Sequence, residues 1–246
     1  MKTSSPQRIA ALTDSGAWGN QTLHGMLAKH AAEIPERLAV KDQPNRVSLI
    51  GDAPLALGWA QLHAAASSLA TQLQTIGVGA DSRLLVQLPN VVELLVLYYA
   101  CSRLGAIISP VPVQYGAHEL GVIAAALKPD LAVSIPGFRG DALGEKMRDA
   151  LPELSVLEFG RDLKIDPEAP GQGEVTGVDA NDILSICWTS GTTGTPKGVP
   201  RSHNMWFATA RCTMLAGDYR HDDVLLNPFP LVNMAALGGF LFPAAL

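Results

Sequence analysis

The stretch Thr189-Ser190-Gly191-Thr192-Thr193-Gly194-Thr195-Pro196-Lys197-Gly198 decides how the rest of this 246-residue chain is interpreted. It holds three glycines, four threonines and one serine, and it directly follows the apolar segment 183–188, which we expect to be a buried strand. Small residues let an anion approach the backbone, amide N–H groups can converge on that anion, and Lys197 adds a positive charge. A strand that opens into such a run predicts a phosphate-binding loop.

Two other interpretations of this loop compete with that prediction. The Walker A pattern Gly-x-x-x-x-Gly-Lys-Ser/Thr does not match, because Lys197 lies between Pro196 and Gly198. A solvated surface loop is the simpler alternative, since glycine, serine and threonine are common in such loops. The length of the match, with a strand before it and a helix after it, favours the phosphate-binding loop.

The ten-residue string resembles the signature loop of the adenylate-forming (AMP-binding) superfamily, which includes acyl-CoA synthetases and other AMP-dependent synthetases and ligases. This resemblance implies that the loop contacts the β- and γ-phosphates of ATP while a substrate carboxylate attacks the α-phosphorus. It implies ATP, Mg²⁺ and CoA as cofactors, a catalytic role for Lys197, and no metal ligand among these residues. The implied nucleotide-binding residues are Thr189, Ser190, Gly191, Thr192, Thr193, Gly194, Thr195 and Lys197.

A second resemblance lies in residues 230–236, which read PLVNMAA where family members often read Pro-Leu-Phe-His-x-x-Gly. Asn233 stands at the usual histidine position, near the junction of the acyl pocket and the nucleotide. Residues 199–204 (VPRSHN) are similar to the aryl-acid branch of the family. The resulting substrate-pocket residues are Val232, Asn233, Met234 and His203. The alternatives are a turn residue at Asn233 and an ordinary polar residue at the start of a helix at His203.

Composition and charge exclude several classes of protein. Apolar residues make up 48% of the chain and charged residues 17%, so a large core can form and disorder is not expected. The net charge is −5 and no basic block appears, which argues against a nucleic-acid partner. The three cysteines have no metal-ligand spacing and predict reduced thiols in the cytoplasm. No apolar stretch reaches the ~20 residues of a membrane span.

Short apolar strands alternate with helical segments along most of the chain, and this pattern predicts an α/β fold with doubly wound, largely parallel sheets and flanking helices. We expect an α/β region over 1–160, an acidic Pro/Gly linker over 161–181, and over 182–246 the phosphate-loop strand and helix leading into a second, truncated α/β subdomain. Residues 1–21 read as an irregular lead-in. The segments 38–41 and 47–50 read as a hairpin, and 223–227 reads as a further strand.

The resemblance covers only the N-terminal portion of the family pattern. The family's Tyr-Gly-x-Thr-Glu segment, its ribose-binding aspartate and its C-terminal lid with a catalytic lysine are absent, and the chain ends at Leu246 inside an apolar run. We therefore expect an N-terminal fragment that is inactive alone, from an ATP-dependent carboxylic acid:CoA ligase. An aryl-acid or amino-acid adenylating enzyme that loads a carrier protein, and a nucleotide-binding module without catalysis, are the alternatives. The expected substrate is a small carboxylic acid. Which acid it is, and whether the chain forms a homodimer, are left open.

Overall fold

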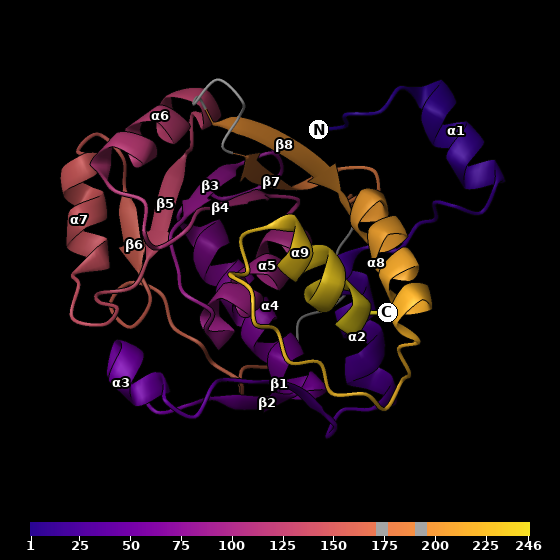
Figure 1. Cartoon of the computed structure of the whole chain (residues 1–246), viewed down its shortest axis with the longest axis horizontal. Helices are drawn as coiled ribbons and strands as arrows, with labels where there is room; N and C mark the ends of the chain where they lie inside the picture. The colour runs from indigo at the N-terminus through magenta and orange to yellow at the C-terminus, as the bar shows by residue number, and fades with distance from the viewer. Residues whose placement is uncertain (171–176, 190–195) are drawn as a thin grey trace.

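Six strands form the central sheet of the computed structural model (Figure 1): β3 (Arg83–Val86), β4 (Ile107–Pro110), β5 (Leu131–Ser134), β6 (Val156–Glu158), β7 (Ile183–Thr189) and β8 (Lys197–Ser202). The structure describes residues 1–170, 177–189 and 196–246, and all helices and strands named below belong to these ranges. The strand order is β6-β5-β3-β4-β7-β8. All neighbours run parallel except β8, which pairs antiparallel with β7. The expected largely parallel sheet is confirmed, with an antiparallel strand at one edge.

Helices cover both faces of this sheet. One face carries α2 (Leu23–Glu33), α4 (Trp59–Thr75), α5 (Val92–Leu104) and α8 (His203–Gly217), and the other carries α6 (Ala117–Leu127) and α7 (Leu143–Ala150). β3 shows how one strand serves both cores: Leu84 and Val86 join the first core, and Leu85 joins the second. A strand buried on both sides is apolar throughout rather than alternating. That explains the continuous apolar runs in the sequence.

A small antiparallel pair, β1 (Leu38–Lys41) with β2 (Ala56–Gly58), lies apart from the main sheet. The expected hairpin of 38–41 with 47–50 is wrong, because the second segment forms the short helix α3 (Arg46–Ile50). Arg46 is buried and donates to the carboxylates of Asp42 and Glu93, so the chain turns inward at this point. The strand that pairs with β1 comes only after this helix.

The N-terminal residues also differ from the expectation of an irregular lead-in. They contain α1 (Pro6–Asp14), whose N-cap Ser5 accepts a hydrogen bond from the Arg8 backbone N–H at 3.3 Å. Serine at the N-cap followed by proline in the first turn favours a helix start. The Ser5-Pro6 pair is therefore the local signal for this helix.

The chain after α8 forms no further strand in the described residues. The expected strand 223–227 is instead a segment without regular secondary structure, and Val224 and Leu226 are 91% and 85% exposed. A strand requires a neighbouring ladder of hydrogen bonds, and the described residues supply none to this segment. The chain then continues through α9 (Met234–Ala236), the short π-helical segment η1 (Leu237–Leu241) and α10 (Phe242–Ala244), of which η1 and α10 pack on α8 (Figure 1).

The expected domain division stays a prediction, but its parts are connected through the sheet. β7 and β8, from the segment 182–246, belong to the same sheet as β3–β6. The segment 161–170 is not simply exposed: Leu163 is buried, and the Lys164 backbone N–H donates to Gln72 of α4.

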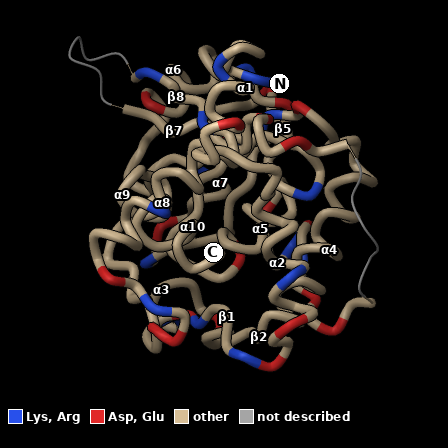
Figure 2. The backbone as a smooth tube through the Cα atoms, turned by 90° about the vertical axis from the view of Figure 1, so that its right-hand side faces the viewer, with Lys and Arg blue, Asp and Glu red and all other residues tan. Residues whose placement is uncertain are grey.

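Acidic and basic residues are interspersed along the described part of the backbone tube (Figure 2).

Candidate functional site

The base of the predicted phosphate loop is the β7–β8 hairpin. Six of the expected nucleotide-binding residues, 190–195, lie outside the described residues. The other two, Thr189 and Lys197, are cross-strand neighbours, and the Thr189 hydroxyl donates to the Lys197 carbonyl at 3.5 Å. The sequence predicted a loop through residue 198, whereas β8 begins at Lys197. The Lys197 side chain is exposed and makes no hydrogen bond or ion pair with a residue that the structure describes.

Trp188 fixes this hairpin to the rest of the sheet. Its indole N–H donates to the Ser109 hydroxyl on β4 at 2.8 Å, and its cross-strand partner is Gly198. A Cβ at position 198 would lie 3.0 Å from Ile186 Cγ2 and 3.3 Å from Trp188 Cη2, so this position favours glycine by packing. The sequence shows a tryptophan before the loop but cannot show that Ser109, 79 residues earlier, anchors it.

His203 lies at the start of α8, fully buried against α2. The helix N-cap is Ser202, whose hydroxyl accepts from the Met205 N–H. His203 Nδ1 accepts a hydrogen bond from the Leu23 backbone N–H at 3.2 Å. Burial, with a smaller contribution from His24, lowers the pKa of His203 to about 3, so its ring is neutral. His203 therefore satisfies a backbone donor at the start of α2, and its role in a substrate pocket stays a prediction.

The expected substrate-pocket residues of the segment 230–236 lie at the start of α9. Asn233 Oδ1 accepts from the Ala236 N–H at 2.9 Å, which makes Asn233 the N-cap of this helix. Val232 is buried and Met234 is half-buried against the main core. In the described part of the chain, no hydrogen bond or ion pair joins these side chains to Lys197. The alternative of a turn residue did not name this helix-cap contact, and the pocket assignment of all three residues stays a prediction.

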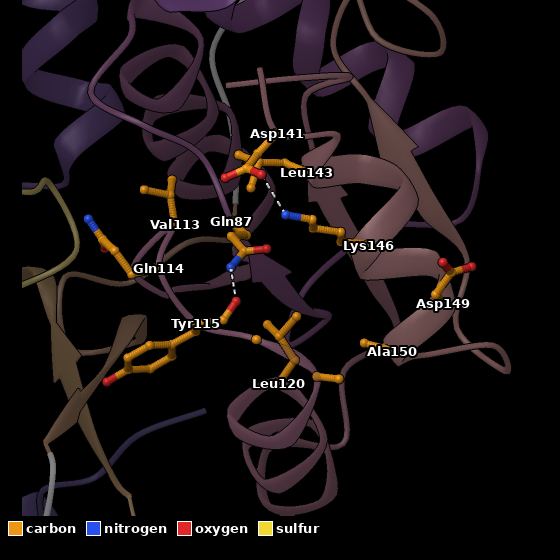
Figure 3. A pocket seen from close by; sticks show the side chains of 12 residues that line it. Gln87, Val113, Gln114, Tyr115, Leu120, Asp141, Leu143, Lys146, Asp149 and Ala150 are labelled. Atoms are coloured by element: carbon orange, nitrogen blue, oxygen red, sulfur yellow. Dashed lines mark hydrogen bonds and ion pairs between the residues drawn. The ribbon is translucent and has the colours of Figure 1, made fainter. Parts of the chain in front are cut away.

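A cavity of about 400 Å³ opens at the carboxyl ends of β3 and β4 (Figure 3). The chain leaves β3 through α5 on one face and leaves β4 through α6 on the other, so this is the point where open α/β sheets commonly bind ligands. Gln87 lines it and donates to the carbonyls of Pro112 and Tyr115 at 3.1 and 2.9 Å. None of the sequence-predicted site residues that the structure describes lines this cavity, and no motif in the sequence marks it.

Neither a metal-binding cluster nor an activated thiol at Cys187 is found among the described residues. No cluster of three or more His, Cys, Asp or Glu side chains with metal-binding geometry occurs among them. Burial raises the pKa of the Cys187 thiol to about 11, which disfavours a thiolate. Within the same residues, no helix combines the length and apolar character needed to cross a bilayer.

The fold, the antiparallel pair β7–β8 and the sequence of residues 189–198 define a class of protein. The chain belongs to the AMP-binding enzyme family, whose pattern matches residues 36–246. The chain spans about two fifths of the length of its curated relatives. It is therefore similar to the N-terminal part of longer proteins.

Three curated relatives illustrate the range of the family. A long-chain-fatty-acid–CoA ligase, FadD13 of Mycobacterium tuberculosis, is 27% identical over 89% of this chain and 43% of its own length. A 2-hydroxy-7-methoxy-5-methyl-1-naphthoate–CoA ligase of Streptomyces carzinostaticus is 30% identical over 92% of this chain and 42% of its own length. A salicyl-AMP ligase / salicyl-S-ArCP synthetase of M. tuberculosis is 28% identical over 94% of this chain and 43% of its own length.

A solved structure supports the same placement. The inhibitor-bound N-terminal domain of FACL13 from M. tuberculosis superposes with a TM-score of 0.73 and 25% identity, over 92% of this chain and 55% of that chain. The fold of this chain is thus that of the N-terminal domain of acyl-CoA synthetase-like enzymes.

Proposed function

We propose that this chain supplies the ATP-handling part of an AMP-forming carboxylic acid:CoA ligase. The observation that carries the proposal is the string Thr189–Gly198. It begins at the last residue of the parallel strand β7 and contains the exposed Lys197. Ligands of open α/β sheets bind at this edge. The family relatives act on fatty, naphthoic and salicylic acids, as their names state, which supports a carboxylic acid as substrate.

In the proposed reaction, a carboxylate oxygen attacks the α-phosphorus of ATP, and the bond from that phosphorus to the pyrophosphate oxygen breaks. The products are an acyl-adenylate and pyrophosphate, and the CoA thiol then displaces AMP to form a thioester. Negative charge grows on the departing pyrophosphate, and a positioned cation lowers the barrier if it holds that charge more tightly in the transition state. We assign this role to Lys197.

The described residues fit ATP better than they fit a resident metal. Lys197, the first residue of β8, pairs with Thr189, the last residue of β7, and a phosphate would lie at this end of the two strands. The described residues hold no cluster of three or more His, Cys, Asp or Glu side chains that could ligate Mg²⁺. When bound with ATP, Mg²⁺ would neutralise part of the phosphate charge.

Pyrophosphate exchange tests the proposal. An enzyme that combines this chain with the remaining half of the family fold should incorporate labelled pyrophosphate into ATP only when a suitable aryl, alicyclic or medium-chain acid is present. We expect the 246-residue chain alone to bind ATP or pyrophosphate but to show little exchange. Binding of neither ligand by the chain would overturn the proposal, and rapid exchange by the chain alone would overturn its second part.

A carrier-protein acceptor is the second candidate. It is favoured by the similarity to the salicyl-AMP ligase / salicyl-S-ArCP synthetase and by the sequence VPRSHN at 199–204. The first half-reaction is the same, so pyrophosphate exchange does not separate the two. Transfer of the labelled acyl group to free CoA, compared with transfer to a phosphopantetheinylated carrier protein, does separate them. A nucleotide-binding module would give binding without either transfer.

A further inference from the structure

Arg201 is a half-buried cation without an anionic partner in the described part of the chain. Its side chain makes no hydrogen bond or ion pair with any residue there, and its Nε atom is buried and unsatisfied. It does contact an aromatic ring: the guanidinium carbon lies 5.7 Å from the centre of the Trp206 ring. Burying a hydrogen-bond donor without a partner is costly, and the described residues leave the Nε atom of Arg201 uncompensated.

The β7–β8 register places Arg201 and Lys197 on one face of the same strand. Arg201 pairs with Ser185 and Lys197 pairs with Thr189, in an unbroken register. Because side chains alternate along a strand, residues four apart point to the same side. The Ser185 hydroxyl accepts from the Trp206 indole N–H at 2.8 Å, so this side faces α8. Two cations that lack an anionic partner among the described residues thus lie about 13 Å apart along β8, at the ~3.3 Å rise of a strand.

Stacking on Trp206 does not by itself account for this placement. A cation over an aromatic face contributes about 0.5–2 kcal/mol and leaves the N–H donors of the guanidinium unused. The planar guanidinium fork matches the paired oxygens of a carboxylate or a phosphate, and Arg forms bidentate bonds with both. Because no described residue accepts from the Arg201 side chain, its guanidinium donors can serve an oxyanion that contacts this half-buried residue.

We propose that Arg201 is an anion-binding residue that holds a carboxylate or phosphate oxyanion on the α8 side of β8. This rests on the proposed function only in assigning the other cation, Lys197, to the phosphates of ATP. Anion binding itself does not require that assignment. The sequence places Arg201 within the stretch 199–204 (VPRSHN), but the surroundings of its side chain become visible only when the strands and α8 are assembled.

Trp206 provides a built-in reporter, because the guanidinium lies over its ring. The chain is labelled with ¹⁵N-tryptophan and titrated separately with benzoate and with inorganic pyrophosphate, while the Trp206 indole N–H resonance is followed. Ligand-free melting temperatures are measured in parallel. The variants are Arg201→Gln, Arg201→Lys and Lys197→Gln. Arg211→Gln is the matched control, since it removes one positive charge from the neighbouring helix α8, where Arg211 donates to the Ala17 carbonyl.

The proposal expects wild type and Arg211→Gln to bind the same anion with equal affinity, and Arg201→Gln to lose about tenfold to hundredfold, the scale of charge-assisted hydrogen bonds. Arg201→Lys should recover part of the loss. If the oxyanion is a carboxylate, benzoate binding falls in Arg201→Gln and is kept in Lys197→Gln. If it is a phosphate, pyrophosphate binding falls in both variants. The ligand-free melting temperature of Arg201→Gln should not fall.

Three results would overturn the proposal: neither anion shifts the Trp206 resonance in wild type, both anions bind Arg201→Gln as they bind wild type, or Arg211→Gln weakens binding equally. If Arg201→Gln does not fold, Arg201→Lys alone decides, because it keeps the charge and loses the fork. Failure of the proposed function is seen separately: an enzyme that combines this chain with the remaining half of the family fold then shows no acid-dependent pyrophosphate exchange, although the chain still binds the anion through Arg201.

Discussion

Two neighbouring histidines, His24 in the first turn of α2 and His203 at the start of α8, make the stability of this fold sensitive to mild acid. His203 Nδ1 accepts from the Leu23 N–H, and the Ser102 hydroxyl bonds both the backbone N–H and the Nδ1 of His24. Burial first, and nearby Arg103 second, lowers the pKa of His24 to about 4. Burial first, and His24 second, lowers the pKa of His203 to about 3. In the unfolded chain both return to the ordinary value of about 6.5.

The sign follows from proton binding. Between pH 6.5 and the folded pKa values, the unfolded chain binds more protons than the folded chain, so the free energy of unfolding falls as the pH falls. Well above pH 6.5 the two histidines contribute no pH dependence. At pH 5 each site has lost about 2 kcal/mol relative to pH 8, together about 4 kcal/mol, from the two shifts and ~1.36 kcal/mol per pKa unit. That is a large share of the ~5–15 kcal/mol stability of a typical domain.

Urea denaturation at pH 8, 7, 6 and 5 measures this loss. His203→Gln keeps a side-chain acceptor that does not titrate, so we expect it to remove about half of the decrease between pH 8 and pH 5. His118→Gln, at an exposed position on α6, is the control for losing one histidine and should leave the decrease unchanged. If wild type and His203→Gln lose the same stability between pH 8 and pH 5, the buried neutral histidine is not the cause and the reasoning fails.

Three further substitutions test other parts of the structure. Gly144→Ala should lower the free energy of unfolding by about 1–3 kcal/mol, because a Cβ there would overlap Glu158 Oε1; the matched change Gly121→Ala, with no atom within 4 Å, should raise it by about 0.5–1 kcal/mol, and equal effects in urea melts would contradict this. Arg46→Met should cost about 3–5 kcal/mol in the same assay, since two buried carboxylates lose their partner; a neutral result would show that they are solvated. Lys197→Ala, in an enzyme carrying both halves of the fold, should lower pyrophosphate exchange by ~10²-fold, and an unchanged rate would remove Lys197 from the mechanism.

Much of the fold could be predicted because its signals are local. Thr22 caps α2 and Gly105, with φ of 67°, ends α5, and both residue types favour such helix boundaries. The helices α4, α5 and α6 follow from apolar spacing or continuous apolar character. The family was likewise expected from ten consecutive residues, because the loop needs those residue types next to each other. Local preferences of this kind act within a few residues and can be seen in one sequence.

The errors concern features that depend on distant partners. The apolar segment 47–50 has the composition of a strand, but the buried bonds of Arg46 to Asp42 and Glu93 favour a helix there. The segment 223–227 also has the composition of a strand, and it lacks a neighbouring strand in the described residues. Whether an apolar segment becomes a strand depends on which segment pairs with it, and composition does not determine that.

The sequence by itself determined the family, the alternation of strands and helices, and the loop that would hold phosphate. The tertiary structure alone decided what surrounds that loop. It brought Ser109 to Trp188, directed His203 to the start of α2, and placed the guanidinium of Arg201 over the Trp206 ring. The physical reason is that residue type fixes which bonds a side chain can make, whereas strand register and helix packing decide which groups come within reach of it.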